Sequence, residues 1–425
     1  ILCVSFTGCM ENYLDLYPED KITSASFPEN ESDIKLLLNG VYAQLREKEV
    51  YNQGLFGFGI TDGATPNAFN WGTDEVFNKL GAGRLSSSDG GVVTYRWKRC
   101  YEIISRANYL LACMDLVDLS EEAKAKYSGE THFLRGLAYS VLAETYGGVP
   151  IILTNISTEE ARSLKRASLE ETWQQALDDY EVAITNLGVD APEPGRATKG
   201  AALGMKMRAY LYQGKYKEVL SCVEQIDALK KYGLFHSYEG LFDPANENNK
   251  EVLFDIQYIE GENSQGSYID QYCGTGTGSW TRGSRYVPTD DLVAAYETID
   301  GSPVDPENPY ENRDPRLGFT AVLPGSYFLG YRFPNYLYPG GAFNHAGNRL
   351  KHLSTRKYRI QDESKLPPSG QSYINDIILR YADVLLSKAE AIIETNGNVA
   401  DAIAILNRIR TERDDVKISL LPTSM

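Results

Sequence analysis

The sequence is poor in the residues that most catalytic and metal sites use. It holds four histidines and six cysteines in 425 residues, and no histidine pair has a metal-ligand spacing such as H-x-x-x-H. No G-x-S-x-G elbow, phosphate-binding loop or zinc cluster occurs. Gly274, Gly276 and Gly278 lack the strand-to-helix frame that a phosphate cradle needs, so they predict a plain loop. We therefore expect a protein that is not an enzyme and carries no cofactor.

Charge and hydropathy exclude two further classes of partner. Acidic residues outnumber basic ones by 58 to 42, which gives a net charge of −16. Such a surface repels nucleic acid and anionic lipid headgroups, so we expect neither as a partner. No apolar run of about 20 residues occurs, and no helix is therefore expected to span a bilayer. Scattered cysteines such as Cys100 and Cys113 are predicted to be free thiols.

The N-terminus has the pattern of a processed export signal. Residues 1–9, ILCVSFTGC, are apolar and end in small residues before Cys9, as does the end of a secretory signal. The segment from Phe6 to Cys9 is similar to a bacterial lipobox, in which the cysteine carries the lipid. We predict lipidation at Cys9, with a buried N-terminal strand as the alternative. Residues 10–26 lack helical periodicity and suit a tether.

Residues 130–152 carry the strongest helical signal. Apolar side chains recur from Leu134 to Leu142 at helical spacing, which predicts one buried stripe. Gly136 and Ser140 lie on another face, where a second helix backbone could approach closely. A helix with two packing faces indicates a helical array. Gly147 and Gly148, followed by Pro150, are predicted to end this helix.

The remaining chain alternates between helical and irregular patterns. We expect further helices near residues 31–45, 97–111, 178–187, 201–216, 219–223, 377–394 and 402–413. Ala138-Tyr139 and Ala209-Tyr210 are 71 positions apart, which is close to two tetratricopeptide periods. Between 246 and 372 the helical rhythm lapses, apart from a strand at 252–256 and a short helix at 290–296. The prediction is a mainly α fold, a tetratricopeptide-like repeat scaffold with an inserted loop-rich lobe that contains short strands.

Two long polar loops with embedded aromatic residues are the candidate binding elements. Sugar rings have apolar faces and a hydroxyl rim, so glycan sites pair aromatic platforms with amide, carboxylate or guanidinium groups. The predicted ligand-binding residues are Asp62, Asn67, Asn70, Trp71 and Arg84 in the first loop, and Tyr268, Tyr272, Trp280, Arg282 and Tyr286 in the second. Trp71 and Trp280 are the strongest candidates for the aromatic platforms that contact the sugar. The alternative is that each indole packs against the core and holds its loop there. Trp97 and Trp173 fall on helical stripes and are expected in the core.

Several separate motifs resemble the SusD/RagB family and occur in the family's order. They are Leu38–Tyr42 (LNGVY), Leu134-Arg135 with Tyr139 and Tyr146–Pro150 (YGGVP), Asp314–Leu317 (DPRL), Leu379–Leu386 (LRYADVLL) and Leu406–Arg410 (LNRIR). Members of this family are nutrient-binding lipoproteins on the surface of Gram-negative bacteria, each paired with a TonB-dependent, SusC-like porin. The resemblance implies an oligosaccharide ligand, such a porin as partner, and lipid-anchored attachment to the outer membrane.

The predicted organisation has five segments, and several alternatives stay open. The segments are a signal remnant and lipobox (1–9), a tether (10–26), an N-terminal helical region with tetratricopeptide-like hairpins (27–245), a loop-rich ligand-binding lobe (246–372) and a truncated C-terminal hairpin (373–425). The alternatives are an adaptor for proteins or peptides, a family member that binds a non-glycan nutrient, and a hydrolase. Acidic pairs such as Asp290-Asp291 and Asp414-Asp415 could serve hydrolysis only if held across a cleft. Residues 300–307 offer calcium ligands without the EF-hand spacing.

Overall fold

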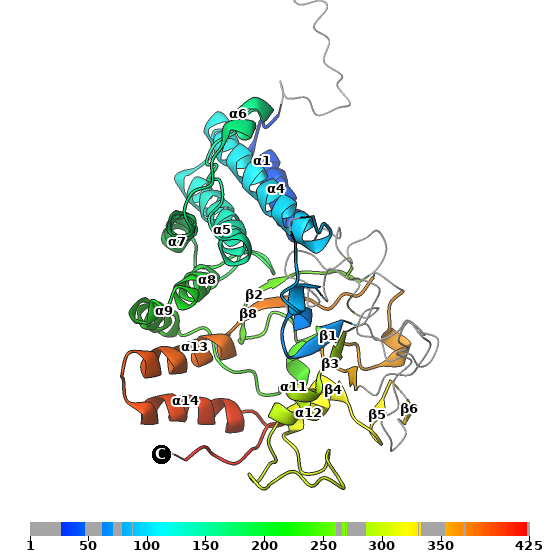
Figure 1. The fold of residues 1–425 in the computed structure, drawn as a ribbon. Coiled ribbons are helices and arrows are strands. Elements are labelled where there is room, and N and C mark those ends of the chain that lie inside the picture. The colour runs from blue at the N-terminus through cyan, green and yellow to red at the C-terminus, as the bar shows by residue number, and fades with distance from the viewer. Residues whose placement is uncertain are drawn as a thin grey trace, which may run out of the picture.

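The structure is a computed structural model that describes residues 27–46, 62–70, 79–86, 88–260, 266–267, 269, 286–329, 331–332, 353–368 and 371–422. Its helices form a curved array, and the short strands gather in a lobe beside it (Figure 1). This confirms the predicted mainly α scaffold with an inserted loop-rich lobe. Across the described ranges, no helix combines the length and the apolar character that crossing a membrane requires.

Nine helices in the described residues build the array and its immediate surroundings. They are α1 (Glu31–Ala43), α4 (Val92–Cys113), α5 (Glu121–Tyr146), α6 (Thr158–Ser163), α7 (Leu169–Asn186), α8 (Lys199–Tyr212), α9 (Tyr216–Ala228), α13 (Tyr381–Glu394) and α14 (Val399–Thr411). Successive helices pack against each other from α4 to α9, although α6 is too short to contribute much. Helix α13 packs on α8 and α9, so the C-terminal pair extends the same array.

Side-chain caps fix where these helices begin. Ser120, Ser168 and Thr198 each accept a hydrogen bond from a backbone N–H in the first turn of the helix that follows. Such caps satisfy N–H groups that have no partner within the helix. Helix α5 begins nine residues before the predicted segment and ends as expected, because Gly147 takes the positive φ of 75° that favours glycine.

The contact between α5 and α7 explains the small residues and the arginine of the central helix. A Cβ at Gly136 would lie 3.0 Å from the Cβ of Asp179, closer than almost all Cβ contacts, so glycine favours this close approach of the two helices. The guanidinium of Arg135 donates to both carboxylate oxygens of Asp179, with Nε–Oδ2 at 3.0 Å and Nη2–Oδ1 at 2.7 Å. It also donates to Oδ1 of Asn108 on α4 at 2.8 Å. Three helices are therefore joined at one buried charge.

The turn after α5 is fixed by the other motif residues. The hydroxyl of Tyr139 donates to the carbonyl of Ile152 at 2.9 Å and accepts from its N–H at 2.7 Å. A Cβ at Gly148 would lie 2.1 Å from the carbonyl oxygen of Ala167, so this position requires glycine. The motif that carries the family resemblance thus has a structural role, since it packs helices and fixes one turn.

The strands are short and pair two by two. They are β1 (Ala68–Asn70), β2 (Val252–Ile256), β3 (Tyr286–Pro288), β4 (Ala321–Val322), β5 (Tyr327–Phe328), β6 (Tyr331–Arg332), β7 (Ser354–Thr355) and β8 (Asp376–Arg380). The antiparallel pairs are β1–β3, β2–β8, β4–β7 and β5–β6. The lobe also holds two short helices, α11 (Asp290–Ala295) and α12 (Pro315–Thr320). The strand predicted at 252–256 is confirmed.

One boundary prediction is wrong. We expected a helix from Ile377, but residues 376–380 form β8 and the helix α13 begins at Tyr381. The apolar run Ile377-Ile378-Leu379 suits a strand as well as a helix, and pairing with β2 decides between them. The sheet lies against α8, where a Cβ at Gly204 would be 2.2 Å from Leu379. It therefore connects the helical array to the lobe.

Trp97, Trp173 and the cysteines within the described ranges lie where the sequence predicted them. Trp173 is 5% exposed, and Trp97 packs on the core with its ring 5.1 Å from that of Tyr146. Cys100 and Cys113 are buried free thiols. In Figure 1 the described segment that follows α14 turns beside the lobe and then runs back along this helix.

Candidate functional site

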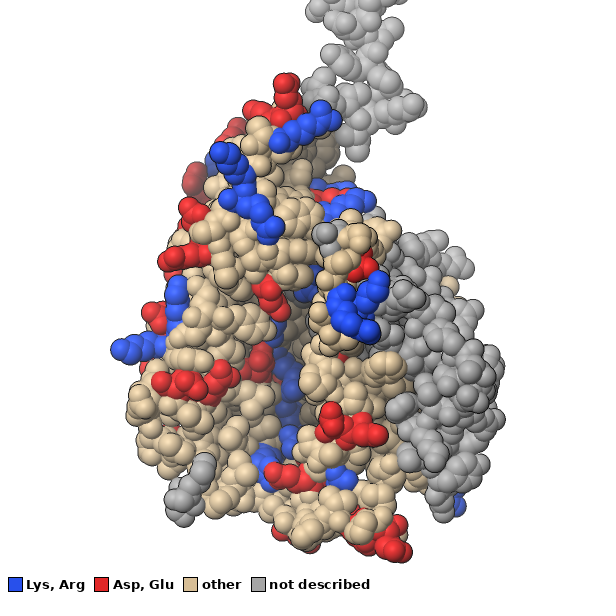
Figure 2. Space-filling model, in the orientation of Figure 1, with Lys and Arg blue, Asp and Glu red and all other residues tan. Residues whose placement is uncertain are grey.

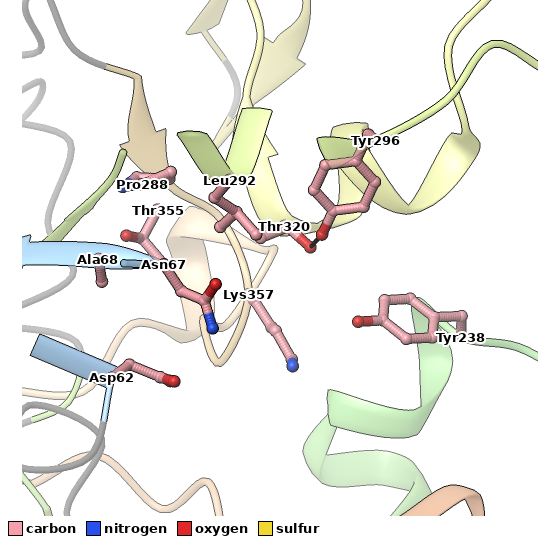
Figure 3. Close-up of a pocket in the computed structure, with 10 residues that line it drawn as sticks. All are labelled: Asp62, Asn67, Ala68, Tyr238, Pro288, Leu292, Tyr296, Thr320, Thr355 and Lys357. Carbon is pink, nitrogen blue, oxygen red and sulfur yellow. Dashed lines mark hydrogen bonds between the residues drawn. The ribbon is translucent and has the colours of Figure 1, made fainter. Parts of the chain in front are cut away.

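A cavity of about 130 Å³ lies where the first polar loop meets the loop-rich lobe (Figure 3). Its lining residues are Asp62, Asn67, Ala68, Tyr238, Pro288, Leu292, Tyr296, Thr320, Thr355 and Lys357. Aromatic and aliphatic side chains form its walls, and a carboxylate, an amide and an amine point into it. This is the combination that small-molecule sites use. The volume suits one sugar ring or its substituents and is too small for an oligosaccharide.

The first loop reaches the cavity through backbone pairing with the lobe. Strand β1 pairs with β3, so that Ala68 stands opposite Pro288. The N–H of Thr289 donates to the carbonyl of Asn67 at 3.1 Å, directly beside this pair. Because two segments more than 200 residues apart share one ladder, the side chains of Asn67 and Leu292 face the same space.

Tyr238 is held by the segment that follows α14. Asp415 accepts hydrogen bonds from the N–H groups of Tyr238 at 2.8 Å and Glu239 at 3.0 Å, and from Oγ of Ser237 at 2.7 Å. The Tyr238 ring also packs with Val416 in a small apolar cluster. The C-terminal segment therefore fixes one wall of the cavity, and Tyr238 is only 9% exposed.

Lys357 places a cation at the cavity without a carboxylate in contact. Its Nζ lies 4.5 Å from the ring centre of Phe242, 4.8 Å from that of Tyr358 and 5.8 Å from that of Tyr238. Cations are attracted to aromatic faces at such distances. In the described part of the chain, Lys357 makes no ion pair within 4.0 Å. Its backbone N–H donates to the carbonyl of Thr320 at 3.2 Å, which fixes the position of the turn.

The charges around the cavity shift the pKa values of its groups. Burial alone would raise the pKa of Tyr238, but the cations Lys357, Arg380 and Arg316 outweigh it, and the pKa lies below its ordinary value. Burial raises the pKa of Asp62, and Lys357 partly offsets this effect. Together these shifts indicate a positive electrostatic potential beside Tyr238 and a poorly solvated carboxylate at Asp62.

The structure places some of the ten predicted binding residues and leaves others outside the described ranges. Asp62 and Asn67 line the cavity, whereas Arg84 is exposed and does not line it. The backbones of Asn70 and Tyr286 pair at the end of the β1–β3 ladder, next to the cavity. The predicted residues that lie outside the described ranges are Trp71, Tyr268, Tyr272, Trp280, Arg282 and the lipidation site Cys9.

Sequence reasoning missed four side chains that the structure brings to the same cavity. Tyr238, Tyr296, Thr320 and Lys357 come from four different segments. The hydroxyls of Tyr296 and Thr320 lie 2.9 Å apart, the contact dashed in Figure 3. No local pattern distinguishes Lys357 from other lysines, since only the tertiary fold places it there.

The acidic pairs that we considered for hydrolysis have local roles. Asp290 and Asp291 occupy the first turn of α11 and are exposed, where negative charge complements the helix dipole. Asp415 is used in holding Tyr238. Asp300 and Asp305 accept hydrogen bonds within their own turns. In the described ranges no group of three or more histidine, cysteine, aspartate or glutamate side chains is arranged to hold a metal.

Two family models match this chain, in sequence order. Residues 12–211 match the model described as "Starch-binding associating with outer membrane", and residues 250–413 match the model of the SusD family. The chain belongs to the SusD/RagB family. The first match covers the array from α1 to α8, and the second covers most of the lobe together with α13 and α14. The two matches include the motifs at residues 134–150 and 379–386.

Known SusD-like proteins are similar over almost the whole chain. SusD-like protein P25 of Formosa agariphila is 26% identical, and the match covers 94% of this chain and 78% of that protein. A SusD-like carbohydrate-binding protein of Bacteroides fragilis superposes with a TM-score of 0.80 at 26% identity, covering 92% of this chain and 80% of that structure. The surface glycan-binding protein A of Bacteroides uniformis shares the fold, with a TM-score of 0.71 at 18% identity and coverage of 92% of this chain and 82% of that structure. The SusD-like fold is therefore established along most of the chain.

Proposed function

We propose that this protein binds an oligosaccharide at the cell surface, without catalysis, and passes it to a SusC-like TonB-dependent transporter. The observation that carries the proposal is the cavity at Asp62, Asn67 and Tyr238, which combines aromatic walls with polar groups that point inward. Membership of a SusD-like, carbohydrate-binding family supports it. The fold-level likeness to a surface glycan-binding protein agrees with it.

The cavity has the chemistry to hold one sugar residue. Tyr238 and Tyr296 offer apolar ring surface to the C–H face of a pyranose. Asp62 accepts hydrogen bonds from sugar hydroxyls, and the Asn67 amide both donates and accepts. With about 130 Å³ available, the remaining residues of an oligosaccharide extend beyond the cavity. In our interpretation the predicted platforms Trp71 and Trp280, which lie outside the described ranges, contact those residues.

Isothermal titration of the wild-type chain against a panel of oligosaccharides tests the proposal. The variants are Asn67→Ala and Asp62→Asn, each of which removes hydrogen-bonding groups from the cavity. Each should weaken the binding of a responsive glycan by about tenfold, because a hydrogen bond to a ligand contributes on the order of 1–2 kcal/mol. Trp71→Ala and Trp280→Ala should each cost a similar amount if those rings are platforms.

Matched controls come from the helical array. Asn155 and Asp118 are exposed and lie outside the cavity, so Asn155→Ala and Asp118→Asn should leave glycan affinity unchanged. A chain that binds no glycan of the panel refutes the proposal. Glycan binding that survives both cavity variants refutes the site. Incubation of the chain with the bound glycan should release no smaller sugar, and any release would indicate a hydrolase.

The anchor and the transporter partner rest on the family resemblance and on the lipobox at Cys9. We infer that the lipid at Cys9 and the tether of residues 10–26 hold the binding domain beside the porin. Co-purification of the chain with a SusC-like porin from detergent extracts tests this step. If the chain binds peptides and no sugar, the glycan-binding proposal is wrong. The protein is then a family member with a non-glycan nutrient or an adaptor for peptides.

A further inference from the structure

Several cationic side chains lie near the Tyr238 wall of the cavity, although the whole chain carries a charge of −16. Figure 2 shows a hollow between the helical array and the lobe with lysine and arginine side chains in its depth. The positively charged side chains around Tyr238 are Lys357, Arg380, Arg316 and Arg413, and the guanidinium of Arg413 lies 5.8 Å from the ring centre. The sign of this potential limits which ligands the cavity favours.

Internal ion pairs neutralise only part of this positive charge. Arg316 pairs with Asp314 at 2.6 Å. Arg413 and Arg380 share a single carboxylate, Glu251, at 2.7 Å and 2.9 Å. The carboxylate of Asp415 also lies at the backbone of Tyr238, where it accepts from that residue's N–H at 2.8 Å. Among the described residues, Lys357 is the cation of this group that no carboxylate contacts. Asp62 is the one acidic side chain in the cavity lining.

Lys357 is the cationic side chain that can contact a ligand in the cavity. The ammonium of Lys357 carries three N–H donors, and the described residues supply no hydrogen-bond acceptor to its Nζ. On one side, this nitrogen lies against the rings of Phe242 and Tyr358. In Figure 3 its Nζ points into the open cavity, between the Asn67 amide and the hydroxyl of Tyr238. The nitrogen faces a space in which an anionic group of a ligand could accept from it.

Resting on the glycan-binding function proposed above, we propose that this cavity selects an acidic sugar residue, with Lys357 binding its anionic substituent. The substituent is a carboxylate of a uronic acid or a sulfate ester, since both accept charge-assisted hydrogen bonds from an ammonium. Asn67 and Tyr238 donate further hydrogen bonds to it. Asp62 lies on the side of the cavity away from Tyr238 and accepts from a hydroxyl of the same ring.

Titration of the full chain with paired oligosaccharides tests the selection. One arm compares galacturonate, glucuronate and mannuronate tetrasaccharides with their neutral methyl esters. The other arm compares sulfated tetrasaccharides with their desulfated forms. The acidic member of at least one pair should bind about tenfold or more tightly than its neutral counterpart. Its affinity should fall as NaCl rises from 20 to 300 mM, because salt screens exposed charge pairs.

The variants distinguish the effect of Lys357 on ligand preference from the effect of the overall charge of the chain. Lys357→Met keeps the aliphatic stem over the rings and should reduce the preference for the acidic ligand to about twofold or less. Lys357→Arg should keep most of the preference. Lys365→Met removes the same charge from an exposed position, where the side chain is 69% exposed, and should leave it unchanged. Circular dichroism melting checks that each variant is folded.

Each outcome decides the inference. Equal affinity for the acidic and neutral members of every pair overturns it, as does a preference that Lys357→Met leaves intact. The chain could instead bind neutral oligosaccharides, lose affinity for them in Asn67→Ala, and show no preference for acidic ones. That result supports the proposed glycan-binding function and refutes only the preference for an acidic sugar. If no saccharide of either kind binds, both proposals fail together.

Discussion

The buried ion pair between α5 and α7 gives the sharpest test of the fold. Replacing Asp179 with alanine leaves the guanidinium of Arg135 without its carboxylate in a site where the two side chains are 7% and 2% exposed. Removing one partner of a buried pair costs about 3–5 kcal/mol, because the remaining charge stays desolvated. Asn108 still accepts one hydrogen bond from Arg135 at 2.8 Å, so we expect a loss near the lower end, about 3 kcal/mol.

Urea denaturation followed by circular dichroism measures this loss as a lower midpoint at unchanged slope. The control is Asp115→Ala, which breaks a surface pair with Lys124 whose side chains are 71% and 46% exposed. Such pairs contribute about 0–1 kcal/mol. The double variant Arg135→Met with Asp179→Leu should recover most of the stability, since no unpaired charge remains. A loss in Asp179→Ala no larger than that of Asp115→Ala would refute the reasoning.

Three further predictions concern the turn, the pH dependence and the anchor. Gly148→Ala should lower the free energy of unfolding, measured by urea denaturation, by roughly 1–3 kcal/mol because its Cβ would collide with Ala167, whereas Gly90→Ala, with open space around it, should leave it unchanged. Burial and the nearby Asp255 raise the pKa of Asp376 to about 7, so its contribution to stability is greatest below its unfolded pKa near 4 and is lost as pH rises through 7. Asp376→Asn should therefore be more stable than wild type at pH 8 and little changed at pH 4, and equal effects at both pH values would contradict this. Cys9→Ser should abolish incorporation of labelled palmitate in a Gram-negative host and release the chain from the membrane fraction, and retention of the label would exclude this lipobox.

The sequence by itself determined the helical array. Apolar periodicity and small residues placed α1, α5, α7 and α13 and the packing face at Gly136, because a helix is specified by local spacing. It also placed the buried strand β2 and the irregular lobe. The ambiguity at Ile377-Ile378-Leu379 was settled only by pairing with β2, since an apolar run of this length fits either element.

Only the tertiary structure decided the cavity. Its lining comes from segments as far apart as Asp62 and Lys357, and the wall at Tyr238 depends on Asp415 near the C-terminus. The sequence proposed Asp62 and Asn67 because their loop is polar and aromatic. It could not propose Lys357, because a lysine acquires its role from the rings and charges around it, and those neighbours are brought together by long-range packing that leaves no trace in local spacing.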